Sequence, residues 1–346
     1  MNPAAASGIR ASSRLRSLGR TGLAITPIGL GGGGLGNLYR DISDEQAIDI
    51  VRTGLDAGFG LIDTAPFYGF GLSERRIGAA LRGRARPILS TKVGRILKPT
   101  RDVSVPRHSF YSREPFEPHY DYSYDGILRS HESSLGRLGV DRVDILLCHD
   151  LGTFAHGAES EHYLAQFLQG GYRAMVELRE QKVVGAIGLG VNECEVCERL
   201  LPECDFDCLL LAGRYTLLEQ PALERLIPQC EARDVSLIIG GPFNSGILAS
   251  AEGHQHAHYN YQTAPRSVVE RVQRIGEICR AFSTPVGAAA LQFVLAHPRV
   301  ASVIPGCSSV DEVRKTHAWM THPIPTELWQ ALRAADLLAS AAPTPS

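Results

Sequence analysis

Residues 300–320 read VASVIPGCSSVDEVRKTHAWM, a short apolar run followed by a polar turn and a longer amphipathic segment. The run Val300–Ile304 is short and apolar, as is typical of a strand that is covered on both faces. The segment Val310–Met320 has the length and pattern of an amphipathic helix. This strand–loop–helix unit indicates the fold, because the same order recurs along the chain.

Seven other apolar runs alternate with longer amphipathic sequence. With the quoted run, the predicted strands are Ile28–Leu30, Leu61–Asp63, Ile88–Lys92, Val143–Cys148, Ala186–Gly190, Cys208–Ala212, Leu237–Ile239 and Val300–Ile304. Eight strands, each followed by a helix, favour a closed parallel (β/α)8 TIM barrel of the α/β class. We predict a single barrel domain over residues 16–340, which begins with a β-hairpin around Leu18–Leu23 and follows a disordered tail over residues 1–15.

The predicted helices have recognisable starts and ends. Ser43 followed by Gln46 fits a capping box, and Gly58 suits a C-terminal cap. Ser73 and Ser123 are the predicted caps of the next two helices. Later helices are predicted at Leu164–Gln181, Leu223–Arg233, Pro285–Leu295 and Val310–Met320, with an extra C-terminal helix at Thr326–Ala339.

Composition and charge exclude several classes of protein. The formal net charge of −2 provides no field that would attract nucleic acid or an anionic membrane, and the chain has no basic stripe. No apolar run reaches the roughly 18 residues needed to span a bilayer. The arginine-containing N-terminus faintly resembles a transit peptide but is interpreted as a tail. We therefore expect a cytoplasmic protein whose eight cysteines are reduced.

Three glycines raise an alternative fold. Gly31, Gly33 and Gly36 match the GxGxxG fingerprint of a Rossmann domain, and Asp63 ends the next strand as a ribose-binding acid would. In that fold the glycines open directly into a helix, whereas residues 37–41 intervene here. We interpret the glycines as part of a loop that a ligand approaches closely.

Two groups of side chains raise the alternative of a metal site. The first consists of four cysteines with irregular spacing, namely Cys194, Cys197, Cys204 and Cys208. The second consists of three histidines in a polar loop, namely His254, His256 and His258. Ordinary buried thiols and a solvated loop are the preferred interpretations, and we expect no metal.

Ionisable residues directly follow several strands, at the barrel end where catalytic groups lie. Asp63, Lys92 and His149 are such residues, and Tyr68 follows soon after Asp63. A free tyrosine has a pKa near ~10, which a lysine ammonium within about 4–6 Å is expected to lower by ~1–3 units. Such a tyrosine suits removal of a hydroxyl proton while hydride leaves the same carbon. A purely structural Asp63–Lys92 ion pair is the alternative.

The sequence around these positions resembles the aldo-keto reductase family. The resemblance is carried by residues 62–69 (IDTAPFYG) with Ser73-Glu74, by residues 90–94 (STKVG), by His149 and by residues 303–306 (VIPG). It extends from about Leu18 to Ala318. It implies an NAD(P)-dependent oxidoreductase with Tyr68 as acid/base. Lys92 and Asp63 would modulate Tyr68, and His149 would orient the substrate.

The resemblance also implies a nicotinamide stacked on Tyr215. The other implied cofactor residues are Asn192, Gly241, Pro242, Phe243, Ile304, Pro305, Gly306, Ser308 and Glu312. Asn192 is expected to replace a serine that many members carry after the fifth strand. NADP-specific members usually carry a Lys after the Ile-Pro and an Arg several residues on, where this chain has Gly306 and Glu312. We therefore expect NAD to be preferred, with NADP as the alternative.

Departures from the common family pattern at residues 122–125, 211–218 and 241–246 resemble one bacterial branch that oxidises cyclic hemiacetals to lactones. We expect a small-molecule sugar of the L-fucose, D-arabinose or L-galactose type, with pyridoxal as the alternative substrate. A homodimer is compatible with the sequence. Gly190 and Ala212 are expected to leave the cofactor side of the site uncrowded.

The stretch Pro99–Tyr122 is predicted to be a structureless insertion that covers the active site as a lid. Its polar side chains are the expected contacts to sugar hydroxyls, namely Arg101, Arg107, His108, Tyr111 and Arg113. Two other functions are weighed against dehydrogenation. A Schiff-base aldolase would need Lys92 neutral and unpaired, and a nucleotide-sensing relative would bind the cofactor with little turnover.

Overall fold

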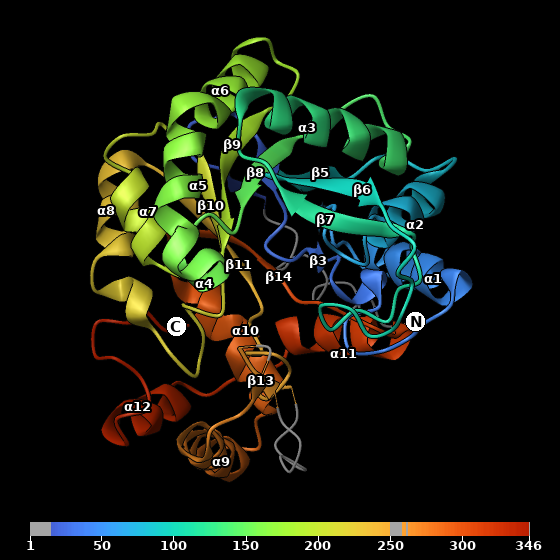
Figure 1. The fold of residues 1–346 in the computed structure, drawn as a ribbon. Helices are drawn as coiled ribbons and strands as arrows, with labels where there is room; N and C mark the ends of the chain where they lie inside the picture. The colour runs from blue at the N-terminus through green and yellow to red at the C-terminus, as the bar shows by residue number, and fades with distance from the viewer. Residues whose placement is uncertain (1–14, 250–257, 261, 346) are drawn as a thin grey trace.

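The computed structural model describes residues 15–249, 258–260 and 262–345, and its centre is a parallel eight-stranded sheet (Figure 1). In spatial order the strands are β14 (Val300–Ile304), β11 (Ser236–Gly240), β10 (Cys208–Ala212), β9 (Ala186–Val191), β8 (Ile145–His149), β5 (Ile88–Val93), β4 (Leu61–Asp63) and β3 (Leu30–Gly31).

The first and last strands of this order also meet. The backbone N–H of Gly29 donates to Val303 O at 2.9 Å, and that of Gly31 donates to Pro305 O at 3.0 Å. These bonds close the sheet, so the predicted (β/α)8 barrel is confirmed. The Rossmann alternative is wrong, because a Rossmann sheet stays open.

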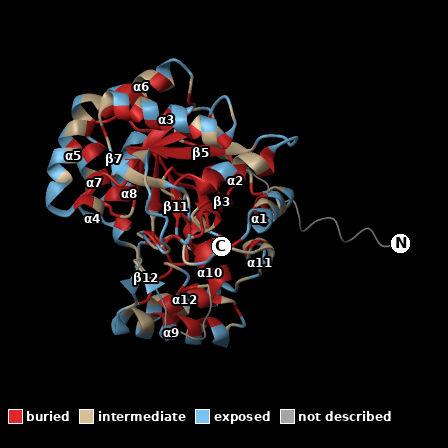
Figure 2. Cartoon of the chain, turned by 45° about the vertical axis from the view of Figure 1, so that its right-hand side comes forward, coloured by how far each residue is buried: buried red, intermediate tan, exposed pale blue. Residues whose placement is uncertain are grey.

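Helices surround the barrel, and Figure 2 shows buried residues toward the centre and exposed residues on the outer faces. The helices are α1 (Asp44–Asp56), α2 (Leu72–Leu81), α3 (Tyr124–Leu138), α4 (Thr153–His156), α5 (Ser160–Gln166), α6 (Tyr172–Glu180), α7 (Glu195–Leu200), α8 (Leu226–Arg233), α9 (Arg266–Ala281), α10 (Val286–Ala296), α11 (Val310–Met320) and α12 (Thr326–Ala334). One apolar cluster fills the space between strands and helices, and a second lies inside the barrel.

Two of the three predicted N-terminal helix caps are present. Ser43 and Gln46 form both hydrogen bonds of a capping box at α1, and the Ser123 side chain accepts from the backbone N–H of Gly126 at α3. The cap predicted at Ser73 is wrong. That residue lies inside α2, which begins after Gly71, and its hydroxyl donates to Gly32 O at 2.9 Å.

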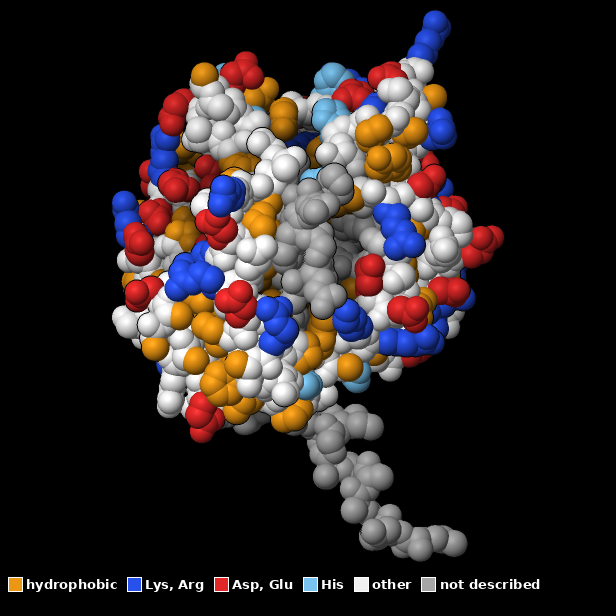
Figure 3. Space-filling model, turned by 90° about the horizontal axis from the view of Figure 1, so that it is seen from below, with side chains coloured by type: hydrophobic (Ala, Val, Ile, Leu, Met, Phe, Trp, Pro, Cys, Tyr) orange, Lys and Arg blue, Asp and Glu red, His pale blue; other side chains and the backbone are white. Residues whose placement is uncertain are grey.

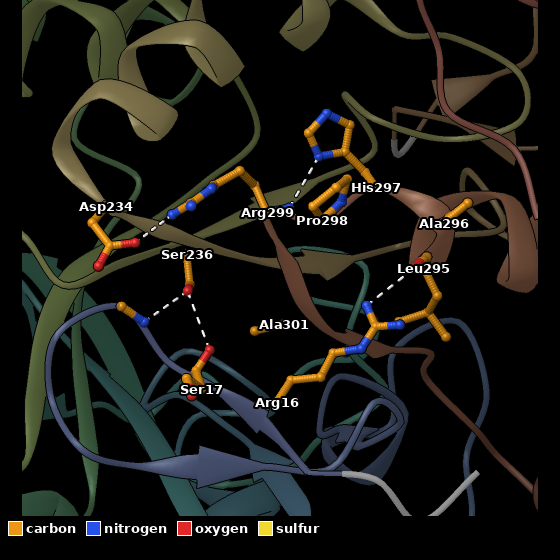
Figure 4. A pocket seen from close by; sticks show the side chains of 11 residues that line it. Arg16, Ser17, Asp234, Ser236, Leu295, Ala296, His297, Pro298, Arg299 and Ala301 are labelled. Atoms are coloured by element: carbon orange, nitrogen blue, oxygen red, sulfur yellow. Dashed lines mark hydrogen bonds and ion pairs between the residues drawn. The ribbon is translucent and has the colours of Figure 1, made fainter. Parts of the chain in front are cut away.

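The predicted N-terminal hairpin is present as β1 (Arg16–Ser17) paired with β2 (Ala24–Ile25). Its residues Leu18 and Ile25 pack into the apolar cluster inside the barrel, so the hairpin closes one end. A cavity of about 590 Å³ lies beside it (Figure 4). There Arg16 donates to Leu295 O at 3.0 Å, and Gly19 N donates to Ser236 Oγ at 2.7 Å. These bonds fasten the hairpin to the barrel end opposite the strand ends that carry the polar residues.

The structure differs from the prediction where the chain leaves the regular repeat. The insertion is not structureless, because its ends belong to an antiparallel hairpin of β6 (Arg95–Pro99) and β7 (Phe116–Tyr120). The helix predicted at Leu164–Gln181 is divided by a π-helical turn at Phe167–Gly171. The turn carries Gly171, where a Cβ would lie only 2.3 Å from Tyr122 O, so only glycine fits this contact.

The predicted helices do not include α4, α7 or α9, and the C-terminal helix ends at Ala334 rather than at Ala339. A second small hairpin, β12 (His258–Tyr259) with β13 (Gln262–Thr263), precedes α9. Within the described ranges, no single helix is long and apolar enough to cross a membrane, and α9 and α10 meet that criterion only as a pair bent by 97°.

Acidic and basic side chains are interspersed on the face shown in Figure 3, in keeping with the small net charge. Apart from Leu15, the tail predicted over residues 1–15 lies outside the described residues. The single domain over residues 16–340 stays a prediction.

Candidate active site

The carboxyl ends of the barrel strands surround a cavity of about 760 Å³. Asp63 ends β4, Lys92 lies near the end of β5, and His149 ends β8. Tyr68 follows β4 in the next loop, and all four side chains line the cavity. The structure therefore brings together the four residues predicted to be catalytic.

The ammonium group of Lys92 is held by two acceptors. Its Nζ lies 2.5 Å from Oδ2 of Asp63 and donates to Thr64 O at 2.9 Å. The other oxygen of Asp63 accepts from Ser90 Oγ at 2.8 Å. Both members of the ion pair are buried, with 1% and 2% of their side chains exposed. An ammonium group satisfies both acceptors, which opposes the neutral lysine that an aldolase needs.

Tyr68 lies beside this ion pair. Lys92 Nζ is 4.6 Å from the centroid of the tyrosine ring, within the range that was predicted to lower the pKa of Tyr68. In the structure the pKa of Tyr68 is instead raised well above its usual value, first by burial and then by the charges of Asp63 and Asp150. The predicted lowering is wrong for the chain by itself, because removal from water outweighs the nearby lysine.

His149 faces Tyr68, with ring centroids 5.8 Å apart and planes nearly perpendicular. Its Nδ1 lies 2.8 Å from a guanidinium nitrogen of Arg95, and its Nε2 lies 3.5 Å from Oδ2 of Asp150. Burial lowers the pKa of His149 well below its usual value, Asp150 raises it in part, and Arg95 and Lys92 lower it further. The imidazole is therefore neutral at physiological pH.

Arg95 and Asp150 line the cavity and were missed by sequence analysis. Arg95 Nη2 donates to Asp150 Oδ2 at 2.8 Å, and Asn192 Nδ2 donates to Oδ1 of the same carboxylate at 3.0 Å. Contacts to His149, Arg95 and Asn192 outweigh burial and lower the pKa of Asp150 to about 2. Each missed residue directly follows a quoted motif, Arg95 after STKVG and Asp150 after His149, and that position was the available signal.

Most of the predicted cofactor residues line the same cavity. They are Asn192, Gly241, Pro242, Phe243, Ile304, Gly306, Ser308 and Glu312. The lining also includes three small residues, Gly190, Ala212 and Gly240, as expected for the first two. A Cβ at Gly190 would lie 3.1 Å from Lys92 Cε, so a larger residue would press on the Lys92 side chain.

Tyr215 and Pro305 are the two predicted cofactor residues that are not among those lining the cavity. Tyr215 is fully buried, and its ring packs against Phe293 and His297 at centroid distances of 5.4 and 5.5 Å. It follows Gly213, whose φ of +70° turns the chain after β10. A nicotinamide in the cavity has no access to this ring, so the stacking role predicted for Tyr215 is wrong.

The insertion contributes fewer of its polar side chains to the cavity than we expected from the sequence. Of its five predicted sugar contacts, only His108 lines the cavity. Arg107 is buried and donates to the backbone oxygens of Phe116 and Glu114, at 3.0 and 2.7 Å. The insertion instead contributes Phe110 and Tyr120 to a wall that includes aromatic residues. Its role as a cover over the site is supported by the backbone bond from Tyr39 N to Ser109 O at 3.1 Å.

Within the part of the chain that the structure describes, the cysteine group does not form a metal site, and the histidine group lies partly outside the described residues. The cysteines Cys194, Cys197, Cys204 and Cys208 are buried free thiols. Among the described residues, no group of three or more His, Cys, Asp or Glu side chains is placed to hold a metal ion. His254 and His256 lie outside the described residues, and His258 stacks on Tyr39 with ring centroids 5.0 Å apart.

Comparisons with known proteins agree with this geometry. Residues 27–337 match the sequence model of the aldo/keto reductase family. The chain is 38% identical over 339 residues to pyridoxal 4-dehydrogenase of Microbacterium luteolum, covering 95% of this chain and 99% of that protein. It is 36% identical over 330 residues to D-threo-aldose 1-dehydrogenase of a Pseudomonas species, covering 94% and 97%.

A solved structure shares the fold over nearly the full length. The holo form of aldo-keto reductase AKR11C1 from Bacillus halodurans superposes with a TM-score of 0.73 at 25% identity, covering 95% of this chain and 98% of that one. The family and these relatives make the chain an oxidoreductase that uses a nicotinamide cofactor and acts on a CH–OH group of a small molecule. The protein belongs to the aldo/keto reductase family.

Proposed function

We propose that this enzyme oxidises a cyclic hemiacetal to the corresponding lactone and prefers NAD as the hydride acceptor. The observation that carries the proposal is the convergence of Tyr68, the Asp63–Lys92 ion pair and neutral His149 at one end of a cavity. The relatives named for aldose 1-dehydrogenation and pyridoxal 4-dehydrogenation support the substrate class.

The cofactor would bind along Asn192, Phe243, Ser308 and Glu312, which line the cavity together with the small residues Gly190, Ala212 and Gly240. When bound, the nicotinamide would accept the hydride. Residues of this chain would accept and position the proton. Tyr68 oxygen takes the proton of the hemiacetal hydroxyl as the C–H electron pair leaves as hydride. The C–O bond thereby becomes the lactone carbonyl, and His149 donates a hydrogen bond to the same oxygen.

Two substrates fit this class, and the structure bears on the choice between them. An L-fucose-type sugar was expected because the insertion is rich in polar side chains, but only His108 of the five candidates lines the cavity. The aromatic side chains Phe67, Phe110, Tyr120 and Phe154 line it as well. Aromatic rings pack favourably on aromatic rings, so pyridoxal is the second candidate substrate beside the sugars.

Product analysis under saturating NAD tests both the class and the substrate. We expect a lactone to accumulate, with one equivalent of NADH, from pyridoxal or from an aldose of the L-fucose, D-arabinose or L-galactose type. Phe154, which lines the cavity and has 46% of its surface exposed, provides a variant with little risk to the core. If pyridoxal is the substrate, Phe154→Leu should raise its KM more than the KM of any aldose. Reduction of open-chain aldehydes without any lactone product would contradict the class.

The raised pKa of Tyr68 predicts the pH dependence of the reaction. Oxidation needs the phenolate as base, so its rate should increase from pH 6 to 10 without reaching a plateau below about pH 9. Reduction needs the neutral phenol as acid and should be nearly independent of pH below the raised pKa. The measurement is kcat in both directions across this range, with chemistry shown to be rate-limiting. A flat oxidation profile would rule out Tyr68 as the titrating base.

A further inference from the structure

Arg95 contacts two active-site side chains at once. It begins β6, and only 5% of its side chain is exposed. Its Nη1 lies 2.8 Å from Nδ1 of His149, and its Nη2 lies 2.8 Å from Oδ2 of Asp150. The guanidinium carbon lies 4.2 Å from the ring centroid of Phe67 and 4.9 Å from that of Tyr120. The two polar contacts and the two aromatic rings together hold the planar guanidinium in one orientation.

The contact with His149 determines where the imidazole carries its proton. A guanidinium has only hydrogen-bond donors, so the Nδ1 atom that it contacts must present a lone pair. In a neutral imidazole the proton then resides on Nε2. A protonated imidazole has no free lone pair, so protonation of His149 would break the bond to Arg95.

Asp150 would favour a protonated His149 if its carboxylate were free to accept a hydrogen bond from the imidazole. Its Oδ2 lies 3.5 Å from Nε2 of His149, beyond the usual length of an N–H···O hydrogen bond. The same oxygen accepts from Arg95 at 2.8 Å, and Oδ1 accepts from Asn192 at 3.0 Å. Because the carboxylate is held by these two donors, the Nε2–H of His149 is available to an oxygen bound in the cavity that His149 lines.

Most of the charges around His149 also favour the neutral imidazole. The titratable or charged side chains that face it are Tyr68 after β4, Lys92 of β5, Arg95 of β6, Tyr122 after β7 (through the His149 carbonyl oxygen) and Asp150 after β8. Burial and the cations Arg95 and Lys92 oppose a charged imidazole, and Asp150 alone favours it. Loss of Arg95 would therefore remove a cation and leave Asp150 without its main partner.

We propose that Arg95 is a positioning residue that holds His149 as the neutral tautomer with its proton on Nε2, ready to donate to the reacting oxygen. The identity of that oxygen, the hemiacetal hydroxyl, rests on the proposed function. The tautomer itself depends on no substrate, so it is measured separately.

The first test is NMR of the full-length protein labelled with ¹⁵N-histidine, with and without bound NAD. The His149 signals are those that are absent from His149→Asn. In the wild type we expect protonated Nε2, unprotonated Nδ1 and shifts that do not change between pH 5 and 8. Arg95→Met, which keeps an apolar side chain between the two rings, should give a mixture of tautomers and a His149 that titrates in this range.

Arg107 provides a matched control on the same inserted hairpin. It is also buried, lies over a phenylalanine ring (4.2 Å from Phe70) and contacts a carboxylate (3.1 Å from Glu117), but it does not touch His149. Arg107→Met should leave the tautomer and titration of His149 unchanged. If Arg95→Met fails to fold, Arg95→Lys replaces it. A lysine keeps the charge, but its single nitrogen lacks the fork that contacts both His149 Nδ1 and Asp150, so the tautomer should still change.

Kinetics give the second readout. Arg95→Met should lower kcat for hemiacetal oxidation by about 10- to 100-fold, because a misaligned donor no longer stabilises the reacting oxygen. Its pH profile should gain an inflection near pH 6–7 that wild type and Arg107→Met lack. A merely structural role for Arg95 would lower activity without adding this inflection.

The outcomes separate this proposal from the proposed function. If His149 keeps the Nε2 tautomer without titrating in the Arg95 variants, or if wild type carries its proton on Nδ1, the role of Arg95 is overturned whatever the activity. If the NMR result is as expected while no hemiacetal is oxidised by wild type, the proposed function fails and the assignment of the tautomer stands.

Discussion

Replacing Tyr68 with Phe is expected to lower kcat for hemiacetal oxidation by about 10²–10⁴-fold or more, because it removes the proton acceptor of the reaction. Nucleotide binding should survive. The ring keeps its edge contact with His149 at 5.8 Å, its contact with Phe110 at 6.3 Å and the Lys92 ammonium at 4.6 Å. The measurement is kcat at saturating NAD and substrate, together with the Kd of NAD from fluorescence or calorimetry.

A second cavity tyrosine provides the control for this substitution. Tyr120 lines the cavity and accepts a hydrogen bond from Arg95 at 3.2 Å, but its hydroxyl has no place in the proposed proton transfer. Tyr120→Phe should change kcat by less than tenfold. Retention of more than a tenth of the wild-type kcat in Tyr68→Phe, with chemistry shown to be rate-limiting, would falsify the assignment of Tyr68 as acid/base.

The fold was predictable because each barrel strand is a short apolar run with polar sequence before and after it. β4, β10 and β14 have the predicted bounds, and β5 is one residue longer than predicted. The candidate catalytic residues were predictable for the same reason, since a polar residue directly after a buried strand projects from the barrel end. The hairpin β6–β7 was not, because Pro and aromatic residues are frequent in loops and the pairing of its two arms is a long-range property.

Side-chain direction accounts for the errors at the site. Tyr215 lies in the expected stretch after β10, but its ring points into the core, and no local pattern encodes that rotation. Asp150 adopts a left-handed φ of +47°, which sequence alone does not predict for an aspartate. From the sequence, the arginines of the insertion were expected to be available for contacts with sugar hydroxyls. The structure shows that the guanidinium of Arg107 donates to backbone carbonyls of its own insertion, so these donors are not available to a sugar.

The enzyme is expected to prefer NAD over NADP by roughly 10- to 150-fold in kcat/KM, since that is the range of one charge-assisted hydrogen bond of about 1.5–3 kcal/mol. This chain has an anion, Glu312, at a position where NADP-specific enzymes of the family usually have a cation. Glu312 lines the cavity near the start of α11, and its carboxylate accepts from Ser308 N at 2.6 Å. A 2′-phosphate there would meet a negative charge, whereas a 2′-hydroxyl can donate to it. Because Glu312 is exposed, screening by solvent places the effect toward the lower end of the range.

Two nearby cations, Lys315 and Arg314, could weaken this preference if they reached the nucleotide. Lys315 lines the cavity, with its Nζ 4.9 Å from a ring centroid of Trp319, whereas Arg314 is not among the lining residues and contacts Asp311 at 3.4 Å. Glu312→Lys should therefore raise kcat/KM for NADP by at least tenfold and lower it for NAD. Asp311→Lys makes the same change of charge one residue away, on a side chain that is 92% exposed and outside the cavity. It should leave the ratio of the two cofactors nearly unchanged. Equal kcat/KM for NAD and NADP in the wild type, or equal shifts in the two variants, would show that Glu312 does not select the nucleotide.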